Sequence, residues 1–462
     1  MLGASIIMAG TVTEGERLFG ESAGLHLFSP VSGEIKAWAP IERRKELLNA
    51  AWKLRQWLAD RGVEHTCGYL ETYRCHFERQ RKVRRERAMG PTPDPGASGE
   101  PDLRWVHGKL AERVRARKDA KSGPDPRPRC SLFAECRIHP GEAANRWQPA
   151  ADADPELRDA RRGQVGWRAL AKLDEWQRAK KGSFFWEHLK NPILVRLGDP
   201  SADEDALRRC FTFGDLQLSE PGPGEDQYLA FICADGDDMG QLLAGLDWNL
   251  CGWGEAEPWQ HNASFSRAFN ACVQEAYHEA VADVVPMDEV REAMKKGARG
   301  RIKLPILPQL LGGDDLWTVC RRDVAFEFGA SFAAHFAARL RADPVMKKAL
   351  VLARAGSVST GNSSGINLTI SMGMAFAKAS YPVVHMIEQA EELMASAKAL
   401  RKGQVPGRSG SGKACVDWHR VISTTLESVE SARGLGWGYC AEEVTVRLTT
   451  RPWTVEDSQK FV

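Results

Sequence analysis

The sequence predicts an α+β fold, with two helices on one face of an antiparallel sheet. Apolar runs and helix-like stretches alternate from residue 226 onwards in the order strand, helix, hairpin, helix, strand, helix, strand. The first strand is Tyr228–Cys233, and the hairpin has apolar arms on either side of Gly312-Gly313. That order is typical of a ferredoxin-like domain.

Residues 1–66 are predicted to form a small α/β region. A short apolar strand is expected at Ser5–Met8, and a hairpin joins His26–Phe28 to Ile35–Trp38. A helix follows over Glu42–Arg61, since its apolar residues recur at helical spacing. No motif identifies this region.

Residues 67–225 are predicted to be helix-rich and basic. Arg74–Arg87 holds seven Lys or Arg residues against two Glu, and Arg113–Lys121 continues the basic character. Such a stretch either binds the phosphate backbone of a nucleic acid or forms a solvated helix face. Gly90–Pro101 reads as a Pro/Gly linker, and tryptophans within Pro155–Lys190 lie at the helical spacing of a core.

A structural zinc site is one interpretation of the cysteines in this region, and thiols without metal are the other. The candidates are Cys67, Cys75, His76, Cys130, Cys136 and His139. Their Cys-to-Cys spacings are looser than those of common zinc modules.

Acidic residues follow two of the predicted strands. Asp235, Asp237 and Asp238 come directly after Tyr228–Cys233, and Asp314 and Asp315 come at the tip of the hairpin. Each group alone is compatible with a polar turn, because turns favour Asp and Gly. If the two strands are neighbours, Asp235, Asp314 and Asp315 converge, and divalent cations relieve the repulsion between them. The stretch Glu289–Arg301, charged and basic at its end, is predicted to be a loop over these carboxylates.

Composition excludes some classes of function. Lys and Arg number 63 against 61 Asp and Glu, so no global charge favours a nucleic acid or a membrane. No apolar run is long enough to span a bilayer and no signal pattern opens the chain, which predicts a soluble cytoplasmic protein without a membrane partner. Eleven scattered cysteines indicate reduced thiols.

The DGDDMG and LGGDD stretches resemble the palm domain of the large subunit of type III CRISPR effector complexes, a III-B-like polymerase/cyclase. Thr369–Lys378 resembles the family strand with its S-x-G-x-A-x-x-K pattern, and Val384–Leu400 and Cys415–His419 resemble the helix and the strand after it. The resemblance covers 226–423. Related GGDEF cyclases have an acidic residue and Phe where this chain has Leu316 and Trp317.

The resemblance implies synthesis of cyclic oligoadenylates from ATP with two Mg²⁺ or Mn²⁺ ions, inside a complex with guide RNA, target RNA and other effector subunits. We expect Asp235, Asp314 and Asp315 to be the metal ligands and catalytic residues. Residues expected to hold the nucleotide are Gly236, Asp237, Gly240, Gly312, Gly313 and Lys378. Asp238 is expected to face solvent, Ser371 and Gly373 to serve packing and close backbone approach, and His385 and His419 to be structural.

The domain organisation expected from the resemblance is a palm at 226–425 and the start of a truncated carboxy-terminal helical domain at 426–462. A degenerate first palm is one interpretation of residues 1–66. The chain contains no His-Asp dipeptide, so we expect no nuclease activity of the family's kind. Two alternatives remain: an RNA-binding scaffold without catalysis, and a stand-alone dinucleotide cyclase.

Overall fold

The computed structural model describes residues 228–246, 258–295, 302–359, 365–379, 381–405 and 408–421 as its main body. Shorter described stretches are 14–15, 17–19, 26–31, 34–38, 43–60, 146–147, 164–165, 193, 207–208, 216, 428–429, 431, 433, 438–441, 444–447 and 451–458. The predicted Ser5–Met8 strand, the basic stretches, the linker and the six zinc candidates lie outside the described residues.

A six-stranded sheet with the order β14-β11-β10-β6-β9-β8 forms the centre of the fold. Its strands are β6 (Tyr228–Gly236), β8 (Ile306–Gly312), β9 (Asp315–Arg321), β10 (Ile370–Lys378), β11 (Cys415–Arg420) and β14 (Trp453–Thr454). The four strands β10-β6-β9-β8 pair antiparallel. They are the fourth, first, third and second strands of the domain along the chain, which confirms the predicted ferredoxin-like order.

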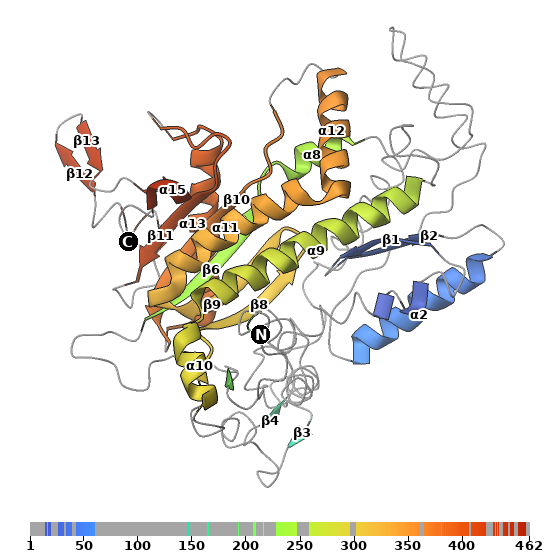
Figure 1. Cartoon of the computed structure of the whole chain (residues 1–462), viewed down its shortest axis with the longest axis horizontal. Helices are drawn as coiled ribbons and strands as arrows, with labels where there is room; N and C mark the ends of the chain where they lie inside the picture. Colours follow the sequence, from blue (N-terminus) through green and yellow to red (C-terminus); the bar gives the residue numbers. More distant parts are fainter. Residues whose placement is uncertain are drawn as a thin grey trace, which may run out of the picture.

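Two long helices cover one face of this sheet. They are α9 (Pro258–Val284) and α11 (Ala325–Ala342), which lie side by side over the sheet and run roughly along its strands (Figure 1). Ala230, Ile232 and Ala234 alternate along β6 and pack under these helices. Tyr277 of α9 meets Phe328 of α11 edge to face, with ring centroids 5.6 Å apart.

The opposite face is covered by α13 (Val383–Arg401), which joins β10 to the parallel strand β11. Leu229, Phe231 and Cys233 of β6 point to this side and share a core cluster with Leu393. A Cβ at Gly373 of β10 would lie 2.0 Å from the carbonyl oxygen of Ala390. This glycine therefore allows backbone to approach backbone, as the sequence predicted.

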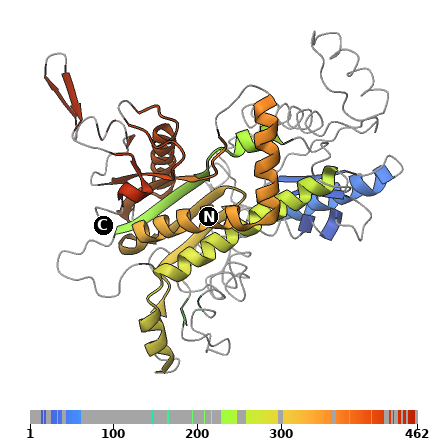
Figure 2. The same ribbon diagram turned by 45° about the horizontal axis from the view of Figure 1, so that its top comes forward.

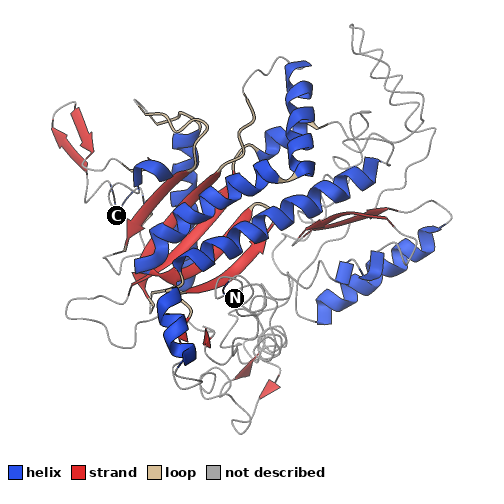
Figure 3. Cartoon of the chain, in the orientation of Figure 1, coloured by secondary structure: helices blue, strands red, loops and turns tan. Residues whose placement is uncertain are grey.

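The remaining elements surround this domain, and Figure 3 separates its helices from its strands. They are β1 (His26–Val31), β2 (Glu34–Trp38), α2 (Arg44–Asp60), β3 (Arg146–Trp147), β4 (Gln164–Val165), β5 (Leu207–Arg208), α8 (Met239–Gly245), α10 (Met287–Lys295), β7 (Ile302–Lys303), the 3-10 turn η8 (Arg322–Val324), α12 (Pro344–Ser359), β12 (Gly438–Ala441), β13 (Val444–Arg447) and α15 (Val455–Ser458). The hairpin β1–β2 and helix α2 agree with the amino-terminal prediction.

One predicted loop is a helix in the structure. The sequence predicted that Glu289–Arg301 is a loop over the carboxylates, but Met287–Lys295 forms α10. Charged residues recur on one side of this stretch, which is the pattern of an amphipathic helix. α10 contacts β7, which precedes the start of β8, whereas the acidic hairpin tip follows the end of β8. In Figures 1 and 2, α10 lies at the opposite end of the domain from α8 and α12.

The carboxy-terminal stretch adds to the sheet. Trp453 and Thr454 form β14 against β11, and Trp453 packs edge to face on Trp418 with ring centroids 4.8 Å apart. The Arg451 guanidinium donates to the Trp418 carbonyl oxygen at 2.6 Å. Within the described stretches, no helix has the length and apolarity needed to cross a bilayer.

Candidate active site

The two acidic strand ends predicted to converge are neighbours in the sheet. β6 and β9 pair antiparallel, and their last registered pair is Ala234 with Leu316. The next residue of each strand is an aspartate, Asp235 on β6 and Asp315 on β9. Directly opposed residues of an antiparallel pair have Cβ atoms about 5 Å apart on one face of the sheet. Both aspartates thus continue the side of the sheet that α13 covers.

Asp314 joins them through a close approach at Gly236. A Cβ built on Gly236 would lie 2.8 Å from the Cβ of Asp314 and 3.5 Å from its Oδ2 atom. Any side chain at residue 236 would therefore push Asp314 away from the end of β6. The turn itself needs Gly313, which has a φ of 63°, a left-handed conformation that glycine adopts without steric cost.

Asp314 and Asp315 hold protons more tightly than ordinary aspartates. Burial raises the pKa of the half-buried Asp314 carboxyl. Desolvation also raises the pKa of Asp315, and the charges of Asp314 and of Glu391 on α13 raise it further. Ionisation of these carboxylates is disfavoured in the free protein, and a bound cation would stabilise their charged form.

Lys398 of α13 supplies a cation that the sequence reasoning missed. Its ammonium is in ion-pair contact with Asp235 Oδ2, and the side chains are 25% and 21% exposed. Burial lowers the pKa of this ammonium, and the nearby Lys402 lowers it further. Lys398 is the positive charge that the structure brings to the carboxylates on the α13 side of the sheet.

Lys378, which was predicted to neutralise a triphosphate, is at the wrong end of its strand. β10 runs antiparallel to β6, so Ser371 pairs with Asp235 while Lys378 pairs with Tyr228. Seven residues of strand separate the two positions, or about 23 Å. The chain then returns along α13, which brings the end of that helix to the carboxylates. The direction of β10 was the signal that could have selected Lys398.

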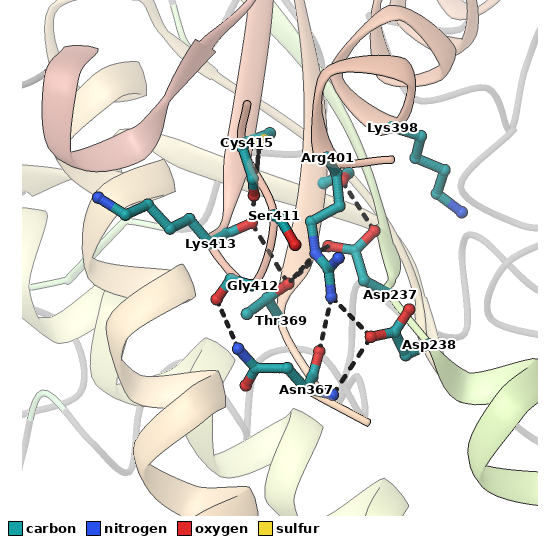
Figure 4. Close-up of polar contacts among 12 residues, drawn as sticks. Asp237, Asp238, Asn367, Thr369, Lys398, Arg401, Ser411, Gly412, Lys413 and Cys415 are labelled. Carbon is teal, nitrogen blue, oxygen red and sulfur yellow. Dashed lines mark hydrogen bonds and ion pairs between the residues drawn. The ribbon is translucent and has the colours of Figure 1, made fainter. Parts of the chain in front are cut away.

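Asp237 and Asp238 have other partners than solvent or ligand. Asp237 is buried and accepts hydrogen bonds of 2.8 Å from the hydroxyls of both Thr369 and Ser371. Burial raises its pKa, and these two hydrogen bonds act against that rise. Asp238 was expected to face solvent, but it accepts a 2.6 Å hydrogen bond from Arg401 (Figure 4).

Two other predicted residues, Gly312 and Gly240, lie within two residues of the acidic pairs along the chain. Gly312 ends β8 and pairs with Asp315. Gly240 lies in the first turn of α8, with open space where a Cβ would be.

The two histidines have structural surroundings. His385 forms a surface pair with Glu388. His419 is buried, and its pKa is lowered to about 4, first by burial and then by the charges of Arg433 and Arg451. Cys233, Cys272, Cys320 and Cys415 are free and buried.

The donor set at this end of the sheet fits a hard divalent cation. Carboxylate oxygens are the ligands that Mg²⁺ and Mn²⁺ prefer, and Gly236 leaves room beside Asp314. In the described part of the chain, no three His, Cys, Asp or Glu side chains are already arranged around a common metal position. The Asp235 carboxylate is engaged by Lys398, so it must turn from that ammonium to take part in such a site.

The fold and the paired acidic strand ends define a palm domain of the polymerase and nucleotide cyclase class. Residues 228–405 match the family model described as Cas10/Cmr2, second palm domain. Residues 228–405 are therefore a palm domain of the Cas10/Cmr2 kind, and the resemblance drawn from the sequence is confirmed for that domain. No curated protein matches the chain.

Three solved structures are similar to parts of the chain. The Csm1-Csm4 cassette in complex with one ATP is 18% identical, with a TM-score of 0.23, over 40% of this chain and 21% of that one. The cassette in complex with cA4 is 16% identical, with a TM-score of 0.22, over 40% and 20%. Csm1 in T. onnurineus is 16% identical, with a TM-score of 0.37, over 89% and 47%. The chain spans less than half the length of each.

Proposed function

We propose that this chain is the large subunit of a type III CRISPR effector complex, and that its palm makes cyclic oligoadenylates from ATP when target RNA binds. The observation that carries the proposal is the meeting of Asp235, Asp314 and Asp315 at one end of the sheet, next to the ammonium of Lys398. A purely structural turn needs no such concentration of charge.

Each residue has a role in this proposal. Asp235, Asp314 and Asp315 bind Mg²⁺ or Mn²⁺, with the Gly236 carbonyl as a further oxygen ligand. Two such ions, when bound, make a ribose hydroxyl nucleophilic and stabilise the pyrophosphate leaving group. Lys398 takes the role first given to Lys378 and holds the triphosphate, because it is the ammonium beside Asp235. The glycines at 236, 240, 312 and 313 keep side chains away from the nucleotide.

The partners follow from the same proposal. Guide RNA, target RNA and other effector subunits assemble with this chain, and the complex works in the cytoplasm. The basic stretch Arg74–Arg87 is the proposed contact for an RNA backbone. The domain limits at 1–66, 67–225, 226–425 and 426–462, and zinc binding by the cysteines of the second region, stay predictions.

The test is product formation by purified protein incubated with ATP or GTP and Mg²⁺ or Mn²⁺, with and without guide and target RNA. We expect oligoadenylate that depends on target RNA. Asp314→Ala combined with Asp315→Ala should abolish the product and leave assembly intact. Asp288→Ala is the control, because the Asp288 side chain is 98% exposed on α10, away from the carboxylates.

Other outcomes favour the alternatives. Cyclic di-GMP as the product would identify a stand-alone cyclase. Assembly with RNA but without any product from the wild-type protein would identify a scaffold. Product formed at the wild-type rate by the Asp314 and Asp315 double variant would contradict the metal assignment.

A further inference from the structure

We propose that Arg401 is a positioning residue that holds the Asp235–Asp238 turn in the shape needed for metal binding. This inference rests on the proposed function, since it deepens the account of the same site. Arg401 is the last residue of α13, and its side chain is 9% exposed. The guanidinium is therefore turned into the protein and is not a contact for substrate.

The guanidinium joins two segments that are far apart in sequence. Its Nη2 atom donates to Asp238 Oδ2 at 2.6 Å and to the Asn367 carbonyl oxygen at 2.9 Å. Its Nε atom donates to Thr369 Oγ1 at 3.1 Å. Figure 4 shows Arg401 between the Asp237–Asp238 turn and the stretch that leads into β10. One side chain thus ties the turn after β6 to the start of β10.

The turn needs this support because of its backbone. Asp238 has a φ of 60°, a left-handed conformation that is strained for a residue with a side chain. Its carboxylate accepts from Arg401 and, at 3.2 Å, from the backbone N–H of Asn367. These two contacts fix the direction in which the chain leaves β6.

Asp237 links the same turn to the start of β10, next to the proposed metal-binding end of β6. Its backbone N–H donates to the Thr369 carbonyl oxygen at 2.9 Å, which extends the pairing of β6 with β10 past Gly236. Its carboxylate accepts from Thr369 Oγ1, the same hydroxyl that accepts from Arg401. Loss of Arg401 would therefore loosen both residues that follow Gly236, and with them the Gly236 carbonyl and the Asp235 carboxylate.

A fork of donors is needed for this arrangement. The three acceptors lie around one planar guanidinium, whereas the single nitrogen of a lysine cannot reach all of them in the same directions. Arg401→Lys keeps the charge and loses the fork. It should behave more like Arg401→Met than like the wild type.

The experiment measures Mn²⁺ affinity of the nucleotide-free, full-length protein by electron paramagnetic resonance, together with its melting temperature. Arg401→Met should weaken Mn²⁺ binding about 10-fold or more, which is the size of effect expected when the outer support of a metal site is lost. Arg433→Met is the matched control. Arg433 is also a largely buried arginine, it donates twice to the buried carboxylate of Asp417, and its contacts are with β11. This control should lower the melting temperature and keep Mn²⁺ affinity within twofold.

A double-variant cycle tests the route through Asp238. If Arg401 acts through that carboxylate, Arg401→Met together with Asp238→Asn weakens Mn²⁺ binding no more than the stronger single change. Equal loss of Mn²⁺ affinity in Arg401→Met and Arg433→Met would overturn the inference, since both would then act by general destabilisation. Unchanged affinity in Arg401→Met would overturn it as well. A wild-type protein that binds no Mn²⁺ would overturn the proposed metal site and this inference with it.

Discussion

Replacement of Lys398 by Met should change the affinities for metal and nucleotide in opposite directions. The ammonium now neutralises part of the charge of Asp235, which it contacts directly. Without it, the carboxylate of Asp235 is free for a divalent cation, while the triphosphate loses its positive partner. Methionine keeps most of the length of the side chain and the helix propensity of α13.

The magnitude follows from the exposure of the pair. Two unit charges about 4 Å apart interact by about 1 kcal/mol in water and about 4 kcal/mol at the effective dielectric constant of a protein surface. Both side chains are about a quarter exposed, which favours the lower part of that range after screening. We therefore expect Mn²⁺ affinity without nucleotide to rise about 10-fold, and affinity for an unreactive ATP analogue with saturating Mg²⁺ to fall about 10-fold.

Isothermal titration calorimetry with Mn²⁺ and with the ATP analogue measures the two affinities. Lys402→Met is the control, because Lys402 is an exposed lysine just after α13 and should change either affinity by less than about twofold. Two constants that move in the same direction in Lys398→Met would refute the reasoning. So would a variant with both constants unchanged.

Three further predictions follow from the same region. Gly236→Ala should lower Mn²⁺ affinity about 10-fold because its Cβ would collide with Asp314, whereas Gly240→Ala, with open space around its Cβ, should leave it unchanged in the same titration. Asp314→Asn with Asp315→Asn should raise the melting temperature of the metal-free protein at neutral pH. A raised pKa means that the native state resists ionisation, so this gain shrinks as pH falls through the raised pKa values towards 3.8, and a scan across pH checks it. The pKa of His419 is lowered from 6.5 to about 4, so the free energy of unfolding should fall by about 2–3 kcal/mol as pH drops from 6.5 to 4. Urea unfolding of His419→Gln should show a smaller fall over the same pH range.

The central sheet and the meeting of the aspartates could be predicted because both depend on local signals. Apolar runs bounded by glycines marked β6, β8 and β9, and carboxylates followed two of them. Once the strands were assumed to be neighbours, Asp235 and Asp315 had to meet, and the register agrees with that assumption.

The choice of Lys378 was wrong because the pattern was used to mark the strand, and the direction of that strand in the antiparallel sheet was not used. The pattern from Ser371 to Lys378 was identified correctly as one strand, but only its first residues lie beside the carboxylates. The roles of Asp238 and Arg401 could not be predicted from the sequence for a related reason. Their contact joins residues 163 positions apart, and neither the turn after β6 nor the end of α13 has a spacing that predicts it.

The contact between Gly373 and α13 limits how the two sides of the site can adjust to a ligand. Main chain meets main chain there, with 2.0 Å between the carbonyl oxygen of Ala390 and a hypothetical Cβ on Gly373. Core side chains change rotamer far more readily than two abutting backbones slide past each other. We therefore expect α13 and the sheet to move as one block, so that side-chain rotations of Lys398 and Asp235 would accommodate the proposed nucleotide. Side-chain rotation, rather than sliding of α13 over β10, is the movement that this contact leaves available.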